Sequence, residues 1–311
     1  MLNLVRNENM KIYRRMRTWI MFLLLGALII GVSILIERNQ PDPGNWKQQA
    51  TEQTASFQKM LKDEKLPDET TRHFTETIAI NDYRIKEDIA PPSGTIWGGV
   101  LEMGNLIILV TIFTVIIAAD SIAGEFSSGT IKMLLIRPNR RGKILLSKYL
   151  ASLLFSLGML IFLFAIAYVT NGLLYGFEGS ILPHLYVSGN GMVHEQAMSL
   201  HVLFSYGLSS VTLLMTVTLA FTISTLFRSS SLSIGLSMAI LFLSDIMIQF
   251  LSKYSWIKYY LFANTNLIRY IEGTPLRDDM TLTFSIVVLV AYFVILNLMS
   301  WGIFSKRDVT A

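Results

Sequence analysis

The sequence contains no cysteine, and only 15% of its 311 residues are charged. Without cysteine the chain forms no disulfide bond, and thiolate metal centres and thiol redox sites are excluded. Soluble domains carry about a quarter charged residues, whereas 52% of the residues here are hydrophobic. This composition indicates a membrane protein.

A nucleotide-binding P-loop, G-x-x-x-x-G-K-[ST], is also missing from the sequence. The pair Gly142–Lys143 is preceded by Arg137 at the position where the first glycine of such a loop is needed. Because the glycine amides of that loop cradle the phosphates, we do not expect this chain to bind ATP by this route. We predict no catalytic residue, no enzymatic activity and no cofactor bound by the chain itself.

Residues for other chemistry are sparse. His184 with His194 and Glu195 would be a conceivable metal site, but their spacing matches no known ligand motif, and we predict no metal there. Hydroxyl residues concentrated in one apolar run could suggest an intramembrane protease. Hydroxyls in membrane helices usually hydrogen-bond neighbouring helices, so we expect them to pack. They are Ser205, Ser209, Ser210, Thr212, Thr216 and Thr218.

Six apolar runs are long enough to cross a bilayer as helices. Backbone polar groups inside a bilayer need partners within the protein, which allows only helices or closed barrels. Runs this long and continuous favour helices over alternating barrel strands of about 10 residues. We predict an all-α, polytopic membrane protein with six transmembrane helices, at 18–36, 97–119, 149–177, 201–227, 229–251 and 281–304.

The charges between these runs predict the orientation. Segments 1–17 and 120–148 are rich in Lys and Arg, whereas Gly179 to Leu200 has neither. The positive-inside rule therefore places both termini and 120–148 in the cytoplasm, and segments 37–96 and 252–280 outside the cytoplasmic membrane. The four basic residues of 252–280 fit this orientation least well.

The first apolar run could be a cleaved signal peptide, because a basic segment precedes it. Its 19 uncharged residues exceed an h-region of about 7–15 residues, so we expect the run to be retained. Segment 1–17 is predicted to be an interfacial helix whose Arg6, Arg14 and Arg17 reach lipid phosphates. The alternative is a plain cytosolic anchor whose arginines only set the topology.

The long segment 37–96 contains two polar stretches compatible with helices, Trp46–Lys65 and Asp68–Asp88, bounded by proline and glycine. Few large apolar side chains occur in them, so we predict a small helical cap rather than a binding domain. If the segment does bind a ligand, the alternative function is a membrane sensor or scaffold that signals through 120–148.

The basic segment 120–148 carries an apolar cluster from Ile131 to Ile136. A loop that only connects two spans needs no such cluster. Thr130 is suited to cap a short helix here, and Pro138 to end it. Such a helix could dock on another protein, or the loop could be held at the membrane by anionic lipid. The composition alone leaves both open.

The spacing in this segment resembles the E-x-x-x-G-T-x-x-x-L-L-x-x-P-x-x-R pattern, followed by a lysine, of ATP-binding-cassette (ABC) type-2 exporter permeases. Phe221–Ser231 is similar to the polar turn of that family between spans four and five, and Leu261–Asn264 to its outer region of short re-entrant helices. Segment 37–96 is longer than in the simplest members. The matching residues are Glu125, Gly129, Thr130, Leu134, Leu135, Pro138, Arg141 and Lys148.

The resemblance implies a coupling helix that docks on a separate ABC ATPase subunit, where ATP and Mg²⁺ would bind. It also implies pairing with a second permease copy or a paralogue through spans one and five, within membrane lipid and without nucleic acid. Permeases of this kind export drugs, antimicrobial peptides, lipids or sodium ions. The coupling residues would be Glu125, Gly129, Thr130, Leu134, Leu135, Arg137, Pro138 and Arg141.

Two acidic residues lie within the predicted spans. Asp245 falls about two thirds along span five and Glu102 near the outer end of span two. An ionised carboxylate at mid-bilayer costs about 3 kcal/mol, so such a residue faces the bundle interior, water or the surface. Both are candidates for a substrate route; each could instead only pack or be solvated. A cation-driven carrier using Asp245 is a further alternative, although no inverted repeat is evident.

Overall fold

The computed structural model describes residues 1–40, 43–63, 68–131, 140–177, 182–187, 191–271, 275–277 and 279–306. Six of its helices are long and apolar enough to cross a membrane, which confirms the predicted class. They are α2 (Met16–Asn39), α5 with α6 (Ile96–Met103 and Ile107–Ser127), α8 (Arg141–Tyr175), α9 (Met198–Leu226), α10 (Ser230–Leu251) and α12 (Leu282–Lys306).

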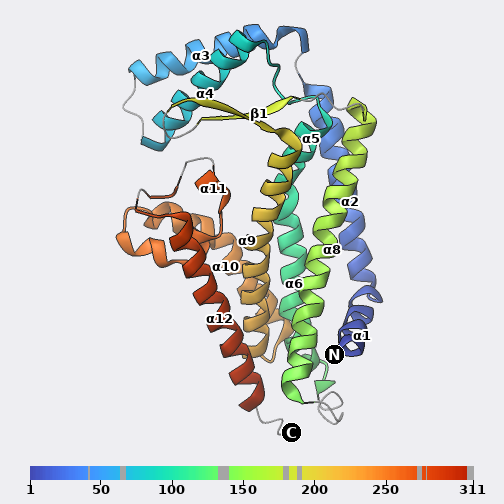
Figure 1. Ribbon diagram of the computed structural model, residues 1–311. Helices are drawn as coiled ribbons and strands as arrows, with labels where there is room; N and C mark the ends of the chain where they lie inside the picture. The colour runs from blue at the N-terminus through green and yellow to red at the C-terminus, as the bar shows by residue number, and fades with distance from the viewer. Residues whose placement is uncertain are drawn as a thin grey trace.

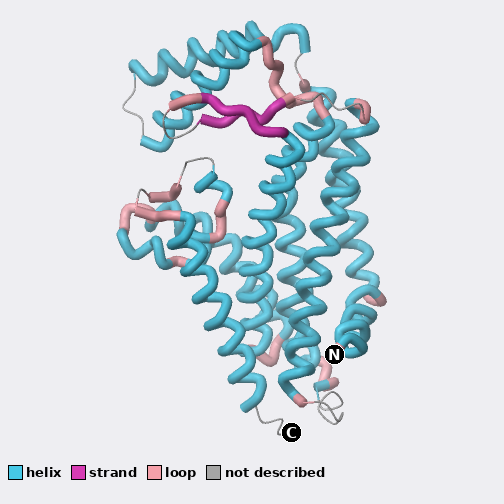
Figure 2. Tube along the Cα trace, viewed as in Figure 1, coloured by secondary structure: helices cyan, strands magenta, loops and turns pink. Residues whose placement is uncertain are grey.

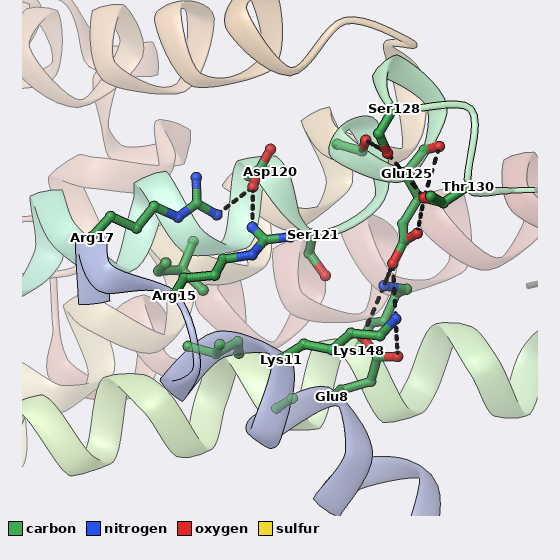
Figure 3. A pocket seen from close by; sticks show the side chains of 14 residues that line it. Glu8, Lys11, Arg15, Arg17, Asp120, Ser121, Glu125, Ser128, Thr130 and Lys148 are labelled. Atoms are coloured by element: carbon green, nitrogen blue, oxygen red, sulfur yellow. Dashed lines mark hydrogen bonds and ion pairs between the residues drawn. The ribbon is translucent and has the colours of Figure 1, made fainter. Parts of the chain in front are cut away.

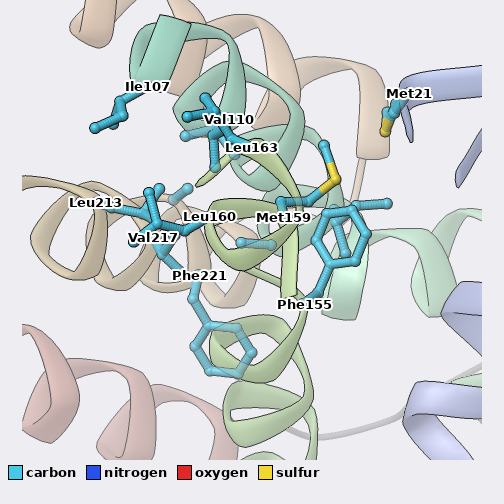
Figure 4. Close-up of a cluster of buried hydrophobic side chains, with 14 of the residues drawn as sticks. Met21, Ile107, Val110, Phe155, Met159, Leu160, Leu163, Leu213, Val217 and Phe221 are labelled. Carbon is cyan, nitrogen blue, oxygen red and sulfur yellow. The ribbon is translucent and has the colours of Figure 1, made fainter. Parts of the chain in front are cut away.

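These helices form an elongated bundle with both chain termini at one end and a small cap at the other (Figure 1). We call these the terminal end and the cap end. The core is formed mainly by α6, α8 and α9 (Figure 4), where Phe155, Met159 and Leu163 of α8 are fully buried beside Val110 and Val217. The outward faces of α2, α10 and α12 keep large apolar side chains exposed, as lipid-facing helices do.

Small residues let helices approach closely near the cap end, at Gly99 of α5 and Ser33 of α2. A Cβ atom on Gly99 would lie 2.1 Å from Oδ1 of Asn171 on α8. Asn171 is buried and its amide lies 3.5 Å from Oγ of Ser33 on α2. Small residues bring membrane helices together in this way because packing and interhelical hydrogen bonds drive their association.

The cap contains the two helices predicted for segment 37–96: α3 (Trp46–Asp63) and α4 (Asp68–Glu87). Their contact includes Phe57 stacked on Phe74 with ring centroids 4.3 Å apart. The sequence did not predict the hairpin formed by β1 (Pro183–Val187) and β2 (Val193–Ala197), which lies between these helices and the bundle (Figure 2). Leu185 is buried in this layer, so the pairing of these short strands is supported by packing above and below.

The first helix, α1 (Leu2–Tyr13), is separate from α2. It is shorter than the helix predicted for residues 1–17. A break at Arg14 and Arg15 separates it from α2, and Oγ1 of Thr18 donates to the carbonyl of Ile12 across the break at 2.6 Å. Between α10 and α12, the expected short helices are present as two 3₁₀ turns, Ser255–Tyr259 and Leu261–Asn264, and α11 (Ile268–Ile271).

Candidate functional site

Two lysines and two glutamates form a ring of ion pairs at the terminal end of the bundle (Figure 3). Lys148 of α8 is only 4% exposed, and its Nζ lies 2.9 Å from both Glu8 of α1 and Glu125 of α6. Lys11 of α1 contacts the same two carboxylates at 3.0 Å. We call these four residues the ionic ring. It joins three helices that are far apart in the sequence.

The electrostatics of the ionic ring are balanced, with two cations and two anions. Burial disfavours the charged form of Lys11, but the charges of Glu8 and Glu125 and their hydrogen bonds with it outweigh that cost and raise the pKa of Lys11. A buried charge that loses its partner destabilises a protein by about 3–5 kcal/mol. The ring therefore holds α1, α6 and α8 in one arrangement only while all four charges are present.

A second ionic contact lies beside the ring on the same side of α6. Asp120 accepts from Nη1 of Arg15 at 2.8 Å and from Arg17 (Figure 3), and the hydroxyl of Ser230 at the start of α10 donates to its other oxygen. Arg15 and Arg17 flank the start of α2. Asp120 thus connects α2, α6 and α10, and a cavity of about 360 Å³ lies between this contact and the ring.

Three of the predicted coupling residues lie together at the end of α6. Glu125 belongs to the ionic ring, and the hydroxyl of Thr130 donates to its carboxylate. Gly129 has φ +70°, a left-handed conformation that costs glycine little and ends the helix. The glutamate, glycine and threonine of the motif thus form one local structure. In it the chain turns at Gly129 just after α6, and Thr130 hydrogen-bonds Glu125.

The other predicted coupling residues are in a different position or are not described. The guanidinium of Arg141 donates to the carbonyl of Ser305 at the end of α12 at 3.2 Å, and Arg141 does not line the cavity beside the ring. The helix that Thr130 was predicted to cap lies outside the described residues. So do the four coupling residues Leu134, Leu135, Arg137 and Pro138.

The two acids predicted for a substrate route do lie on one cavity. This outer cavity, near the cap end, has a volume of about 910 Å³, and both Glu102 of α5 and Asp245 of α10 line it. Its walls also come from α6, α9 and the short segments before α12. The chain therefore has two separate candidate sites: the ionic ring at the terminal end and the outer cavity.

Two histidines lie at the edge of the outer cavity. His184 of β1 stacks on His201 of α9 with ring centroids 3.5 Å apart and planes 10° from parallel. Burial, followed by the nearby His201 and Arg84, lowers the pKa of His184 to about 4. His194 stacks on Tyr186 instead. Across the described ranges, no group of three His, Asp or Glu side chains is placed to hold a metal ion.

The hydroxyl groups of α9 that were predicted to pack have different surroundings. Thr218 pairs with the hydroxyl of Tyr149 on α8 at 2.7 Å, and Thr212 donates to the carbonyl of Thr265 at 3.0 Å. Ser210 and Thr216 donate to carbonyls of their own helix. Such contacts are worth about 1 kcal/mol or less each. Ser205, Ser209 and Thr212 also line the outer cavity.

The sequence analysis missed several residues of both sites. Glu8 is the single acid of segment 1–17, and Asp120 directly follows an apolar run. Both were visible as isolated acids, but Asp120 and its partner Arg15, like Glu8 and its partner Lys148, are more than 100 positions apart along the chain. The stacking of His184 on His201 was not predictable from the sequence, because the two residues are 17 positions apart and are brought together by the β1–β2 hairpin.

The fold defines an integral membrane protein with several transmembrane helices. A family model described as "Protein of unknown function (DUF2705)" matches residues 78–310, and the chain belongs to this family. It is 41% identical to the uncharacterized protein YhcI of Bacillus subtilis (strain 168), over 99% of both chains. It is also 30% identical to the uncharacterized membrane protein YdbK of the same organism, over 66% of this chain and 80% of YdbK.

Proposed function

We propose that this chain is the permease subunit of an ATP-driven ABC exporter of the cytoplasmic membrane. A separate ATPase subunit would bind ATP and Mg²⁺ and dock on the segment that follows Thr130. The observation that carries the proposal is the position of Glu125. The acid of the motif that resembles ABC type-2 permeases is also the residue that ties the start of that segment to α1 and α8.

This arrangement would transmit movement from the docking segment into the bundle. Thr130 and Lys148 stand on either side of the proposed coupling helix, and both hydrogen-bond the carboxylate of Glu125. A displacement of the segment between them would therefore pull on α6, α8 and α1 together. The two nucleotide states of the ATPase would contact the segment differently, and this difference in contact energy would supply the work.

The proposal also uses the orientation that the positive-inside rule predicts. Both termini and the ionic ring would be cytoplasmic, and the cap and the outer cavity would face the outside. A second copy of this chain or a paralogue would complete the transport route, to which Asp245 and Glu102 would contribute. Transport of a substrate, rather than chemistry on it, is the function that these features support.

The test requires an ABC ATPase that co-purifies with the chain, and the two are reconstituted together in vesicles. We expect Glu125→Lys to leave membrane insertion intact but to uncouple ATP hydrolysis from the permease, so that the permease no longer alters the ATPase rate. Leu134→Pro, in the predicted docking helix, should do the same without touching the ionic ring. Asp82→Lys, on the exposed face of the cap, is the charge-reversal control.

Two outcomes would contradict the proposal. If both Glu125→Lys and Leu134→Pro couple ATP hydrolysis as well as the Asp82→Lys control does, the 125–141 segment is not the coupling element. If no ABC ATPase co-purifies with the chain from its native membrane, the exporter assignment itself fails.

A further inference from the structure

The outer cavity has the size and lining of a small-molecule site. Its volume of about 910 Å³ falls within the range of about 300–1,000 Å³ that is typical of ligand pockets. Apolar side chains, among them Ile107, Leu241 and Phe262, form much of the wall, and hydroxyls and amides are spread between them. A cavity of this composition suits a molecule with a large apolar body and a few polar atoms.

The carboxylates of this cavity have no partners among the described residues. The side-chain carboxylates of Asp245 and Glu102 form no hydrogen bond or ion pair there, and only the backbone carbonyl of Glu102 accepts one, from Asn105. The acids of the terminal end differ: Glu8, Asp120 and Glu125 each contact at least one lysine or arginine. Unpaired carboxylates in a membrane protein are costly, and they mark sites where a cation passes or binds.

His201 supplies an independent observation. It is only 5% exposed, it lines the cavity, and neither of its ring nitrogens is hydrogen-bonded by any residue that the structure describes. Its ring nitrogens are not among the fully enclosed polar atoms that lack a partner, so they open onto the cavity, where a bound molecule can hydrogen-bond them. His184, stacked on it, lines the same cavity.

The charge of the lining determines what that partner is. Of the described residues that line the cavity, Arg269 is the one with a permanently positive side chain, against the two carboxylates. With neutral histidines the cavity has an excess of one negative charge. A neutral imidazole also has a free lone pair, which accepts a hydrogen bond from an ammonium group.

We infer that the outer cavity binds an amphipathic organic cation, a molecule with an apolar body and one amine-type positive charge that contacts Asp245 and Glu102. A bare metal ion does not fit, because the cavity is far larger than an ion and the described residues offer no three-ligand group. This inference deepens the proposed function, since it names the class of substrate that the permease would carry.

The probe is dansylcadaverine, which joins an apolar fluorophore to a primary amine. Its N-acetyl derivative has the same body but no charge, and serves as the matched control ligand. Binding is measured by equilibrium dialysis against the full-length chain in lipid nanodiscs, with empty nanodiscs subtracted. No ATP or ATPase is present, so the result does not depend on whether coupling through Glu125 is correct.

We expect saturable binding of the amine and at least tenfold weaker binding of its acetylated form. Asp245→Asn and Glu102→Gln should each weaken amine binding about tenfold, which corresponds to the loss of one charge contact. Asp82→Asn, on the cap and away from the cavity, should leave binding unchanged. Ser209→Phe fills the cavity without removing charge and should weaken the binding of both probes.

Three results would overturn the inference. They are equal affinity for the amine and its acetylated form, unchanged affinity in both carboxylate variants, and no saturable binding up to about 1 mM probe. Asp245 is solvent-exposed in the isolated chain, so Asp245→Asn is not expected to impair folding, and an unchanged melting temperature checks this.

Discussion

At the scale of single residues, the terminal end depends on Lys148. Its side chain is 4% exposed, and its ammonium group lies between two carboxylates that come from α1 and α6. Removing it would leave Glu8 and Glu125 to share Lys11 alone, as two largely buried acids close to each other. The cost of such an uncompensated charge exceeds that of a surface ion pair, which is worth about 0–1 kcal/mol.

We therefore predict that Lys148→Met destabilises the chain by about 3–5 kcal/mol. The melting temperature in detergent, followed by intrinsic tryptophan fluorescence, should fall clearly. The matched control Lys143→Met removes an exposed lysine from the same helix and should change little. Adding Glu125→Gln to Lys148→Met should recover part of the loss. Equal effects of Lys148→Met and Lys143→Met would show that the ionic ring contributes no stability.

A local pattern in the sequence grouped residues that the structure brings together, while their role in coupling stays a prediction. Glu125, Gly129 and Thr130 were identified from spacing within six residues, and they do form one local structure. Lys11 and Asp120 were missed, because a charge pair that spans more than 100 positions leaves no periodic signal. Asp245 and Glu102 were singled out by their cost in a membrane, but only the fold places both on one cavity.

At the scale of elements, the six spans and the cap helices were predictable because their signals are length and apolar content. The β1–β2 hairpin was not, since its ten paired residues alternate weakly and depend on packing between α4 and the bundle. The hairpin is the bridge between cap and bundle: Tyr83 of α4 donates to Glu195 of β2 at 3.1 Å, and His184 of β1 stacks on His201 of α9.

This bridge predicts a pH dependence. Burial, with His201 and Arg84 nearby, lowers the pKa of His184 to about 4, from an ordinary value near 6.5. The unfolded chain therefore binds this proton more readily than the folded one between these values. The resulting stability is complete above about pH 6.5 and is lost as the pH falls towards 4. The melting temperature should therefore decrease as the pH is lowered from about 6.5 to 4.

The comparison variant for this effect is His184→Gln, which removes the imidazole of β1 and keeps His201 and Glu195 of the bridge. We expect its melting temperature to change less than that of the unmodified chain between pH 6.5 and 4. His194→Gln, which alters the partner strand and its stack on Tyr186, should keep the steeper dependence. If the melting temperatures of the unmodified chain and of His184→Gln change equally with pH, His184 is not the source of the pH dependence.

At the scale of the whole molecule, the two candidate sites lie at opposite ends of the bundle. Both termini and the ionic ring are at one end, and the cap and the outer cavity are near the other (Figure 1). The proposed function requires the terminal end to be cytoplasmic, because the ATPase uses cytoplasmic ATP. The Lys and Arg residues of 1–17 and 120–148 that the structure describes lie at that end, as the positive-inside rule predicts for a cytoplasmic face.

The absence of cysteine makes this orientation directly testable, because a single introduced thiol is the only one in the chain. Gln49→Cys places it on the exposed face of α3 in the cap, and Arg140→Cys at the exposed start of α8. With a membrane-impermeant maleimide, we expect Gln49→Cys to react in intact cells and Arg140→Cys only after permeabilisation. The reverse pattern would place the ionic ring outside, where no cytoplasmic ATPase can reach it, and coupling through Glu125 would be impossible. The binding of a cation in the outer cavity would survive that result, since it depends on the lining of the cavity and not on the side from which the ligand enters.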